Sequence, residues 1–430
     1  IAWLVAGRVV AEGSLRQMVT LQLGLSVALV PLTLWFFGGA SWVAPLANLV
    51  AIPAAAVLLP LLVGAVAIAL AIPDFGVPLL RAMSWAWWAL YRALEWLAAS
   101  APHAWLTTGA GGAVLLLAMV GVVLLVAPRG LPVRPLAFAF LLPLFLPRQA
   151  ALPTGHFRLA VLDVGQGLSA VVQTRRHALL FDAGPAWPSG LDMGEAVVAP
   201  YLRWRGVRRL DAMIISHRDM DHRGGAGAVM KALAVDRVLG SDGTGAEPCV
   251  AGQAWQWDGV SFEIFNPPRD GRGSSNDRGC VLRIATGSTA ALLPADIGRA
   301  SEQRLVRDYG ARLAAQVLVS PHHGSAGSSS AAFVAEVHPE LVIHPAGWKN
   351  QFGFPRAEPV ARYARIGARQ VQTGEWGMVD VEAGPRGIIR AAAWRQRRPR
   401  LWQLRPGTAP ELGGAPTLEG QSRVGLGASP

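Results

Sequence analysis

One stretch decides the fold of the second half of this chain: residues 213–222, which read MIISHRDMDH. The apolar triplet at its start is typical of a buried strand, and four potential metal ligands follow within six residues. Imidazole and carboxylate groups so closely spaced in a tight loop can converge on one or two cations at about 2.0–2.2 Å. We therefore predict His217, Asp219, Asp221 and His222 as metal ligands; the alternative is a solvated loop with incidental charge.

Further polar residues follow other apolar runs. Asp296 comes after residues 290–293, and the adjacent His322 and His323 come after residues 317–319. Loops at strand ends present side chains to a common edge. We expect Asp296 to bridge two metals. Because adjacent histidines point in different directions, at most one binds directly; we assign His322 as the ligand and His323 to orientation or substrate contact, the reverse being the alternative.

Two glycine-containing segments complete the candidate site. In Asp163–Gly167 the glycines allow close backbone approach, and we expect Asp163 and Gln166 to support the site or contact the substrate. In Phe181–Gly184 we expect Asp182 to orient a ligand. Plain hairpin turns are the alternative for both segments. A serine nucleophile is excluded, because the chain has no G-x-S-x-G elbow and the acid and histidine cluster is richer than a triad needs.

The same half of the chain alternates short apolar runs with helical patterns, which favours a layered α/β sandwich. The predicted strands are 159–162, 170–172, 178–181, 213–215, 290–293, 317–319 and 341–343, and the predicted helices are 194–204, 225–233, 298–309 and 355–366. We place this domain at residues 151–393. The remainder, 394–430, is rich in Arg, Pro, Gly and Gln, and we predict a disordered tail.

The composition requires a second, membrane-embedded part. Of the 430 residues 52% are hydrophobic and only 16% charged, and the mean hydropathy is +0.34. Residues 17–73 contain no Asp, Glu, Lys or Arg. A membrane span takes about 20 apolar residues. We predict a membrane domain at residues 1–150, with spans at 21–37 and 57–72, separated by a break at 38–39 and the segment 42–53.

Hydropathy alone does not determine which of the remaining segments of this domain cross the membrane. Residues 113–127 are a span of borderline length, and residues 83–97 are an interfacial helix or, alternatively, a tilted span with aromatic belts. Residues 135–147 are short for a span. If they cross, the second domain emerges outside the cytoplasm; if they do not, it is cytoplasmic. The first residue is Ile, so we expect a fragment of a longer protein.

The net charge indicates the kind of partner, and the cysteine count excludes two classes of domain. The net charge is +11, which favours anionic partners such as nucleic acid or lipid head groups. Two cysteines, Cys249 and Cys280, exclude a disulfide-rich scaffold and a cysteine-rich zinc module. They could pair in an oxidising compartment, or Cys280 could be a buried thiol.

Taken in order, these motifs resemble the metallo-β-lactamase-like domain of the ComEC family of competence proteins. The motifs are Asp163–Gly167, Phe181–Gly184, His217–His222, Pro294–Asp296 and His322–Ser325. Residues 17–53 are similar to that family's competence membrane domain. The resemblance implies a multi-pass α-helical membrane domain followed by an α/β metallo-β-lactamase-like (αββα sandwich) domain.

The resemblance also implies a function. Such a chain is a channel of the bacterial inner membrane that takes up single-stranded transforming DNA, in contact with lipid and with the DNA receptor and motor proteins of the competence machinery. Its soluble domain, expected in the periplasm, degrades the other strand with two divalent ions, Mn or Zn. Asp221, His222 and Asp296 become the catalytic candidates, with Ser325 and Asn276 near the substrate. Gln17, Gln22 and Asn48 are polar enough to face a water-filled path; hydrogen bonding between helices is the alternative.

The sequence departs from the family pattern at two positions. Phe354 stands where the family commonly has His, and Gly279 where Ser is usual. Two alternative functions therefore stay open: a channel whose β-lactamase-like domain only binds DNA, and a membrane-tethered metallohydrolase that acts on another ester.

Overall fold

A computed structural model describes residues 15–37, 39–101, 105–107, 112–126, 134–144, 151–241, 243–268 and 273–397. The chain forms two compact units, one made of residues 1–149 and 203–206, the other of residues 150–202 and 207–430. Each unit is described by itself.

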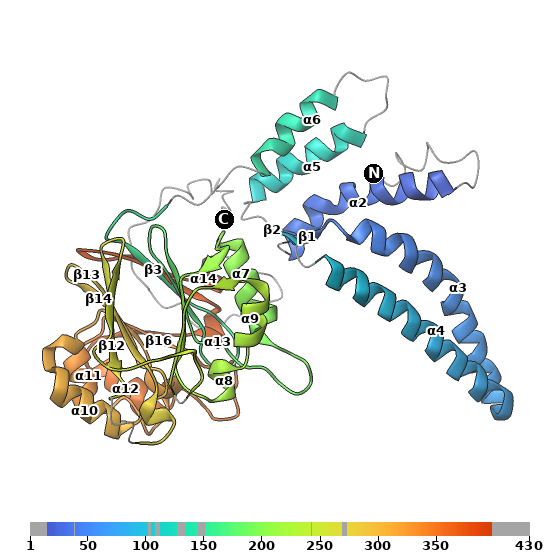
Figure 1. The fold of residues 1–430 in the computed structure, drawn as a ribbon. Helices are drawn as coiled ribbons and strands as arrows, with labels where there is room; N and C mark the ends of the chain where they lie inside the picture. Colours follow the sequence, from blue (N-terminus) through green and yellow to red (C-terminus); the bar gives the residue numbers. More distant parts are fainter. Residues whose placement is uncertain are drawn as a thin grey trace, which may run out of the picture. The chain divides into compact units, whose positions relative to one another are not determined.

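The first unit is helical (Figure 1). Its elements are α2 (Leu15–Phe37), β1 (Gly39–Ser41), α3 (Ala44–Ala71), α4 (Pro73–Ser100), β2 (Trp105–Thr107), α5 (Gly112–Val126), α6 (Arg134–Leu141) and η1 (Leu142–Leu144). Two stretches, Val19–Phe36 and Ala44–Ala71, are long and apolar enough to cross a membrane. Large apolar side chains of α3 such as Leu46, Val57 and Val63 are exposed, which suits a surface that faces lipid.

The predicted interruption between the two spans is present, because α2 ends at Phe37 and α3 begins at Ala44, but residues 44–53, predicted to separate the spans, belong to α3. Helix α3 starts at Ala44 and runs unbroken to Ala71, through Pro53 and Pro60. Pro45 lies in the first helical turn, where no backbone N–H is needed. The predicted interfacial helix 83–97 is the C-terminal part of the longer α4 (Pro73–Ser100). Helices α3 and α4 lie side by side (Figure 1), and Gly76 approaches the backbone of Ala69 so closely that a Cβ there would lie 2.0 Å from Ala69 Cα.

The second unit contains two large sheets. The first has the order β10-β9-β7-β5-β4-β3-β18-β19, and the second β11-β12-β13-β14-β15-β16-β17. The strands of the first sheet are β3 (Phe157–Val161), β4 (Ala170–Gln173), β5 (Ala178–Phe181), β7 (Ala212–Ile215), β9 (Val238–Gly240), β10 (Glu247–Pro248), β18 (Val379–Gly384) and β19 (Gly387–Ala393). Those of the second are β11 (Ala254–Trp257), β12 (Val260–Asn266), β13 (Val281–Thr286), β14 (Thr289–Leu293), β15 (Val317–Val319), β16 (Leu341–His344) and β17 (Arg369–Gln372).

Helices and short elements surround these sheets. They are η2 (Gly194–Val198), α7 (Ala199–Trp204), β6 (Arg209–Leu210), α8 (Met220–Arg223), α9 (Ala226–Ala232), β8 (Ala234–Val235), η3 (Asn276–Arg278), α10 (Arg299–Tyr309), η4 (Gly310–Leu313), η5 (Pro321–Gly324), α11 (Ala331–Val337), α12 (Ala357–Arg365), α13 (Thr373–Trp376) and α14 (Trp394–Arg397).

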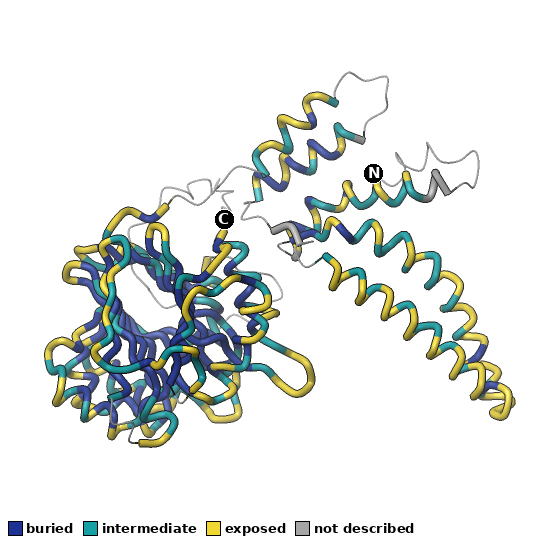
Figure 2. The backbone as a smooth tube through the Cα atoms, in the orientation of Figure 1, coloured by how far each residue is buried: buried dark blue, intermediate teal, exposed yellow. Residues whose placement is uncertain are grey.

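The alternation of side chains along the strands creates three apolar layers. In β5, Leu179 and Phe181 join the core between the two sheets, while Leu180 faces the opposite side. In β14, Leu293 faces the central core and Leu292 the other side. Residues of η2, α7 and α9 cover the first sheet, and residues of α10, α11 and α12 cover the second. The unit is an αββα sandwich, whose buried interior is dark blue in Figure 2.

All predicted strands and helices of this unit are present. The sandwich also contains strands that the apolar runs did not mark, among them β11–β13 and β17–β19. Residues 394–397, predicted as part of the disordered tail, form the helical turn α14, so that prediction is wrong for these four residues. Residues 398–430 lie outside the described residues.

Candidate metal centre

The predicted site residues gather where parallel strands end. Strands β5, β7 and β9 run parallel to one another, as do β14, β15, β16 and β17. The loops after β7, β14 and β15 bring together Asp221, His222, Asp296 and His323, each offering a ligand atom within 4.8 Å of the others. His222, Asp296 and His323 are buried, and Asp221 is half-buried.

Asp296 is at the middle of this cluster. Its Oδ1 lies 3.1 Å from His222 Nε2, and its Oδ2 lies 3.3 Å from His323 Nε2. Asp221 Oδ2 is also 3.3 Å from His323 Nε2. The two imidazole Nε2 atoms are only 3.3 Å apart. Two ring nitrogens and two carboxylates that face one point form a donor set suited to a divalent transition metal.

The opposite nitrogen of each imidazole is anchored. His222 Nδ1 donates to Asp182 Oδ2 at 2.8 Å, and His323 Nδ1 donates to the Pro345 carbonyl at 2.9 Å. Asp182 also accepts hydrogen bonds from the backbone N–H and the hydroxyl of Ser216, each at 2.7 Å. Carboxylate or carbonyl partners of this kind orient metal-binding histidines and fix which nitrogen carries the proton. Asp182 is therefore placed where the sequence predicted an orienting carboxylate.

His217 follows the same pattern. Its Nδ1 is 2.9 Å from Ser216 Oγ, and because the single hydroxyl hydrogen of Ser216 goes to Asp182, Ser216 Oγ accepts from His217 Nδ1. His217 Nε2 then carries a lone pair, and it is fully buried without a hydrogen-bond partner among the described residues. Asp219 Oδ2 lies 3.5 Å away, and Asp219 makes no side-chain cap for α8. A buried imidazole nitrogen with an unused lone pair, next to a carboxylate, is suited to bind a metal ion.

The histidines and carboxylates of the cluster shift one another's pKa values, because opposite charges attract strongly in a buried site. Burial alone would lower the pKa of His323, but Asp296 and Asp221 raise it to about 9. The pKa of His222 is raised in the same way by Asp296 and Asp182, against burial. Burial would raise the pKa of Asp296, yet the two histidines hold it well below its usual range. Without a cation the imidazoles take protons, so a metal ion would compete with those protons.

Backbone conformation explains which histidine enters the cluster. His322 and His323 both have positive φ, 48° and 55°, and their rings point in different directions. His323 is buried against Asp296, whereas the His322 side chain is 35% exposed and its Nε2 lies 3.7 Å from Asp296 Oδ2. The tight cluster thus contains His323, where the sequence analysis preferred His322.

One glycine of the Asp163–Gly167 segment has a definite role. A Cβ on Gly167 would lie 2.3 Å from the carbonyl oxygen of Asp221, and the residue has a φ of +135°. Leu168 N–H donates to the same carbonyl at 3.1 Å. Gly167 therefore lets the loop between β3 and β4 approach and bind the backbone of residues 216–222, the ligand loop after β7.

Other predicted site residues lie outside the cluster. Asp163 pairs with Arg395 of α14 at 2.9 Å, and Gln166 Oε1 accepts from Gly347 N–H at 3.5 Å. Ser325 Oγ lies 3.3 Å from Ser328 Oγ in the turn after η5. Asn276 begins η3 and is not among the clustered residues. These four residues shape or connect loops around the site.

In the loop after β16, sequence reasoning missed the backbone group that anchors a ligand. The Pro345 carbonyl anchors His323, and the Phe354 ring stacks on His323 with centroids 6.4 Å apart. A backbone acceptor leaves no signal in the sequence. The Phe354 position was visible only as a departure from the family pattern.

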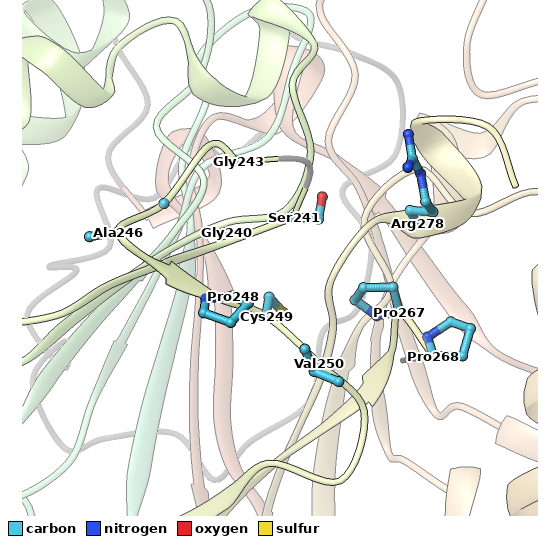
Figure 3. A pocket seen from close by; sticks show the side chains of 11 residues that line it. Gly240, Ser241, Gly243, Ala246, Pro248, Cys249, Val250, Pro267, Pro268 and Arg278 are labelled. Carbon is cyan, nitrogen blue, oxygen red and sulfur yellow. The ribbon is translucent and has the colours of Figure 1, made fainter. Parts of the chain in front are cut away.

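A cavity of about 380 Å³ lies beside the ligand loop (Figure 3). Ser241, on its wall, donates to the carbonyl of Ser216 at 2.6 Å, directly before His217. Its lining comprises Gly240, Ser241, Gly243, Gly245, Ala246, Pro248, Cys249, Val250, Pro267, Pro268 and Arg278. Cys249 is joined to Cys280 in a buried disulfide, so of the two alternatives left open by the sequence, pairing is observed.

The polar residues predicted for the channel lie in α2 and α3. Gln22 Nε2 lies 3.5 Å from Ser26 Oγ, one helical turn away. Asn48 is half-buried in the first part of α3. Gln17 belongs to α2, but its side chain lies outside the described residues.

An αββα sandwich with a His/Asp cluster at its strand ends defines a domain of the metallo-β-lactamase superfamily, and the family model "Metallo-beta-lactamase superfamily" matches residues 162–343. The model "Competence protein" matches residues 3–132. With both domains in this order, the chain belongs to the ComEC-like family of competence proteins. Proteins of the competence family are membrane-associated and involved in DNA uptake.

Individual proteins are similar to this chain. Competence protein ComA of Neisseria gonorrhoeae is 35% identical over 94% of this chain and 57% of its own length. The uncharacterized protein YcaI of Escherichia coli K12 is 30% identical over 90% of this chain and 51% of its own. This chain thus spans about half the length of these curated relatives. Among solved structures, a metallo hydrolase of Ignicoccus hospitalis is 15% identical, with a TM-score of 0.34, over 52% of this chain and 98% of its own.

Proposed function

We propose that this chain is part of a membrane channel for DNA uptake whose sandwich domain is a metal-dependent phosphodiesterase that degrades a DNA strand. One observation carries the proposal. Asp221, His222, Asp296 and His323 converge within 4.8 Å in a domain that follows a competence membrane domain. A channel needs no such buried donor set, whereas a metal-dependent phosphodiesterase uses one to bind its ions.

The chain's side chains could hold two ions. Asp221, His222 and His323 would hold one, and His217, Asp219 and His322 the other. Asp296 would be shared, because its Oδ1 lies near His222 and its Oδ2 lies near both His323 and His322. The mixture of imidazole and carboxylate suits Zn or Mn. When bound, two such ions activate water near neutral pH and stabilise the charge on both the attacking and the leaving oxygen.

The protein's own contribution is orientation. Asp182 fixes His222, the Pro345 carbonyl fixes His323, and Ser216 fixes His217. The Nε2 atoms of His222 and His323 are thereby held toward the cluster, and that of His217 beside Asp219, before any ion arrives. Preorganised ligands avoid a reorganisation cost during the reaction. No protein nucleophile is required for this chemistry.

For the membrane part, we propose that Gln17, Gln22 and Asn48 line the path of single-stranded DNA, since amides facing lipid are costly. We place the sandwich domain in the periplasm. The Cys249–Cys280 disulfide supports that side, because disulfides persist in oxidising compartments.

The test is metal content and DNA cleavage of the purified full chain in detergent. We expect bound metal and metal-dependent cleavage of linear DNA by the unaltered chain, and loss of both in His222→Ala. The matched control is His338→Asn, at an exposed histidine that ends α11 with a φ of 46°, a conformation that Asn tolerates. This control should behave like the unaltered chain.

Two results would overturn the assignment. Metal binding without cleavage of any DNA would point to another ester as the substrate. A folded chain with neither metal nor cleavage would reduce the sandwich domain to a DNA-binding or structural module.

A further inference from the structure

An exposed aromatic loop extends from the metal centre. It consists of residues 347–356, Gly-Trp-Lys-Asn-Gln-Phe-Gly-Phe-Pro-Arg, between β16 and α12. Phe352 is 45% exposed and Trp348 52% exposed, although both are large apolar side chains in a well-packed domain. Exposed aromatic groups next to a site mark a surface that binds something.

The rings of this loop continue a stack that starts inside the site. Phe354 lies on His323 with ring centroids 6.4 Å apart and an interplanar angle of 23°. Phe352 lies on Phe354 at 5.5 Å and 19°. The column therefore leads from a buried histidine of the cluster to a ring that is open to solvent.

The loop is held in this shape by Asn350. Its Nδ2 donates to the carbonyls of Gly347, at 2.9 Å, and Phe354, at 2.7 Å, while its Oδ1 accepts from Phe354 N–H at 2.9 Å. Arg356 N–H donates to Gly324 O, beside His323. A loop braced at both ends presents its rings without an ordering cost on binding.

The charge of the loop is purely positive. Lys349 Nζ lies 4.6 Å above the Trp348 ring, and the Arg356 guanidinium lies 5.9 Å above Phe354. Among the described residues the two cations contact aromatic rings and form no salt bridge, and residues 347–356 contain no Asp or Glu. Flat rings with adjacent cations match a chain of bases joined by phosphates.

We infer that residues 347–356 form a stacking platform for unpaired bases of single-stranded nucleic acid, next to the phosphate that reaches the metal centre. This inference rests on the proposed function and sharpens its substrate, because only a strand whose bases are free can stack on Phe352 and Trp348. A duplex keeps its bases stacked on one another and offers only phosphates to Lys349 and Arg356.

The test is binding of labelled oligothymidylate to the full chain in detergent, with EDTA present so that nothing is cleaved. We expect the double variant Trp348→Ala/Phe352→Ala to bind about 5- to 100-fold more weakly, in line with typical stacking energies. Replacing the thymines by abasic sites should weaken binding by the unaltered chain to a similar extent. The variant Trp348→Phe/Phe352→Tyr should retain most of the affinity.

The matched control is Ile389→Ala, at an apolar residue of β19 that is also 45% exposed. It should bind normally. Equal binding of thymine and abasic oligonucleotides, or an unchanged affinity of the alanine double variant, would overturn the platform even if the chain cleaves DNA. Quenching by brominated lipid that is smaller in Trp348→Phe than in the unaltered chain, together with unchanged DNA binding by the alanine double variant, would show a membrane contact instead. Loss of cleavage with the binding pattern intact would refute the phosphodiesterase and leave the platform standing.

Discussion

At the scale of single residues, the site depends on groups that hold its histidines. Asp182 accepts three hydrogen bonds, from His222 Nδ1 and from the backbone and hydroxyl of Ser216. It has a φ of 57°, and Asn tolerates this conformation, so Asp182→Asn should keep the backbone. The amide nitrogen that replaces one of the two carboxylate oxygens cannot accept a hydrogen bond, so at least one of these three bonds is lost.

We therefore expect Asp182→Asn to lower metal affinity about 10- to 100-fold, which is the usual effect of removing such a partner. A competition titration against a chromophoric chelator measures this. Asp308→Asn, at an exposed residue of α10, is the control and should leave the affinity unchanged. Equal affinities in all three proteins would show that Asp182 does not orient a ligand.

The protonation of His323 leads to a pH dependence. Its pKa in the metal-free protein is about 9, against 6.5 for a free histidine, because Asp296 and Asp221 outweigh burial. A metal must displace that proton, so affinity should rise with pH, by up to tenfold per pH unit for each proton released, and level off above about pH 9.

The same shift affects stability without metal. The attraction between protonated His323 and the carboxylates of Asp296 and Asp221 stabilises the metal-free fold fully below pH 6.5. This contribution is lost as the pH rises through about 9. Titrations of metal affinity and thermal unfolding between pH 6 and 10 measure both trends. A metal affinity that does not change between pH 6.5 and 9 would contradict the assignment of His323 as a ligand.

The residue scale also shows how far the sequence could predict the site. The spacing of His217, Asp219, Asp221 and His222 was sufficient to place the ligand loop. The choice between His322 and His323 depends on two consecutive residues with positive φ, which adjacent letters do not reveal. Asp163 is a carboxylate of the kind found in metal sites, and the sequence suggested such a role. Its actual partner, Arg395, is more than 200 positions away in the chain, so their ion pair could not be predicted from the local sequence.

At the scale of elements, the site requires close contact between the loop after β3 and the ligand loop after β7. Gly167→Ala would bring a Cβ to 2.3 Å from Asp221 O and force Ala into a φ of +135°. We expect a loss of stability of about 2–4 kcal/mol, from strain and overpacking, together with weaker metal binding.

Chemical denaturation and the chelator titration measure these losses. Gly227→Ala is the matched control, because Gly227 lies within α9 and a Cβ there meets nothing within 4 Å. It should be neutral or stabilise the domain by up to about 1 kcal/mol. Similar denaturation midpoints for Gly167→Ala and the unaltered chain would refute the proposed contact.

Buried strands were predictable because β-branched runs bounded by turn residues have few other interpretations. Strands such as β11 and β19 were missed, since Ala254–Trp257 and Gly387–Ala393 contain no long apolar run. In the helical unit, residues 42–53 were predicted to separate two spans, but α3 begins at Ala44, with Pro45 in its first turn, and continues to Ala71.

At the scale of the whole molecule, the sequence indicated two bodies from the uneven distribution of charge. Each is recovered as a compact unit with its own family match. The count of spans was less predictable, because apolar helices of 15 residues or fewer, such as α5, can cross a membrane or pack within a bundle.

The central claim is that the cluster of Asp221, His222, Asp296 and His323 degrades DNA during uptake. It is tested most directly by supplying labelled duplex DNA to competent cells and measuring the label released as acid-soluble nucleotides. Cells carrying the unaltered protein or the control Asp308→Asn should release label. Cells carrying Asp221→Asn should release little, with the protein still present in the membrane. Undiminished release by Asp221→Asn would contradict the account.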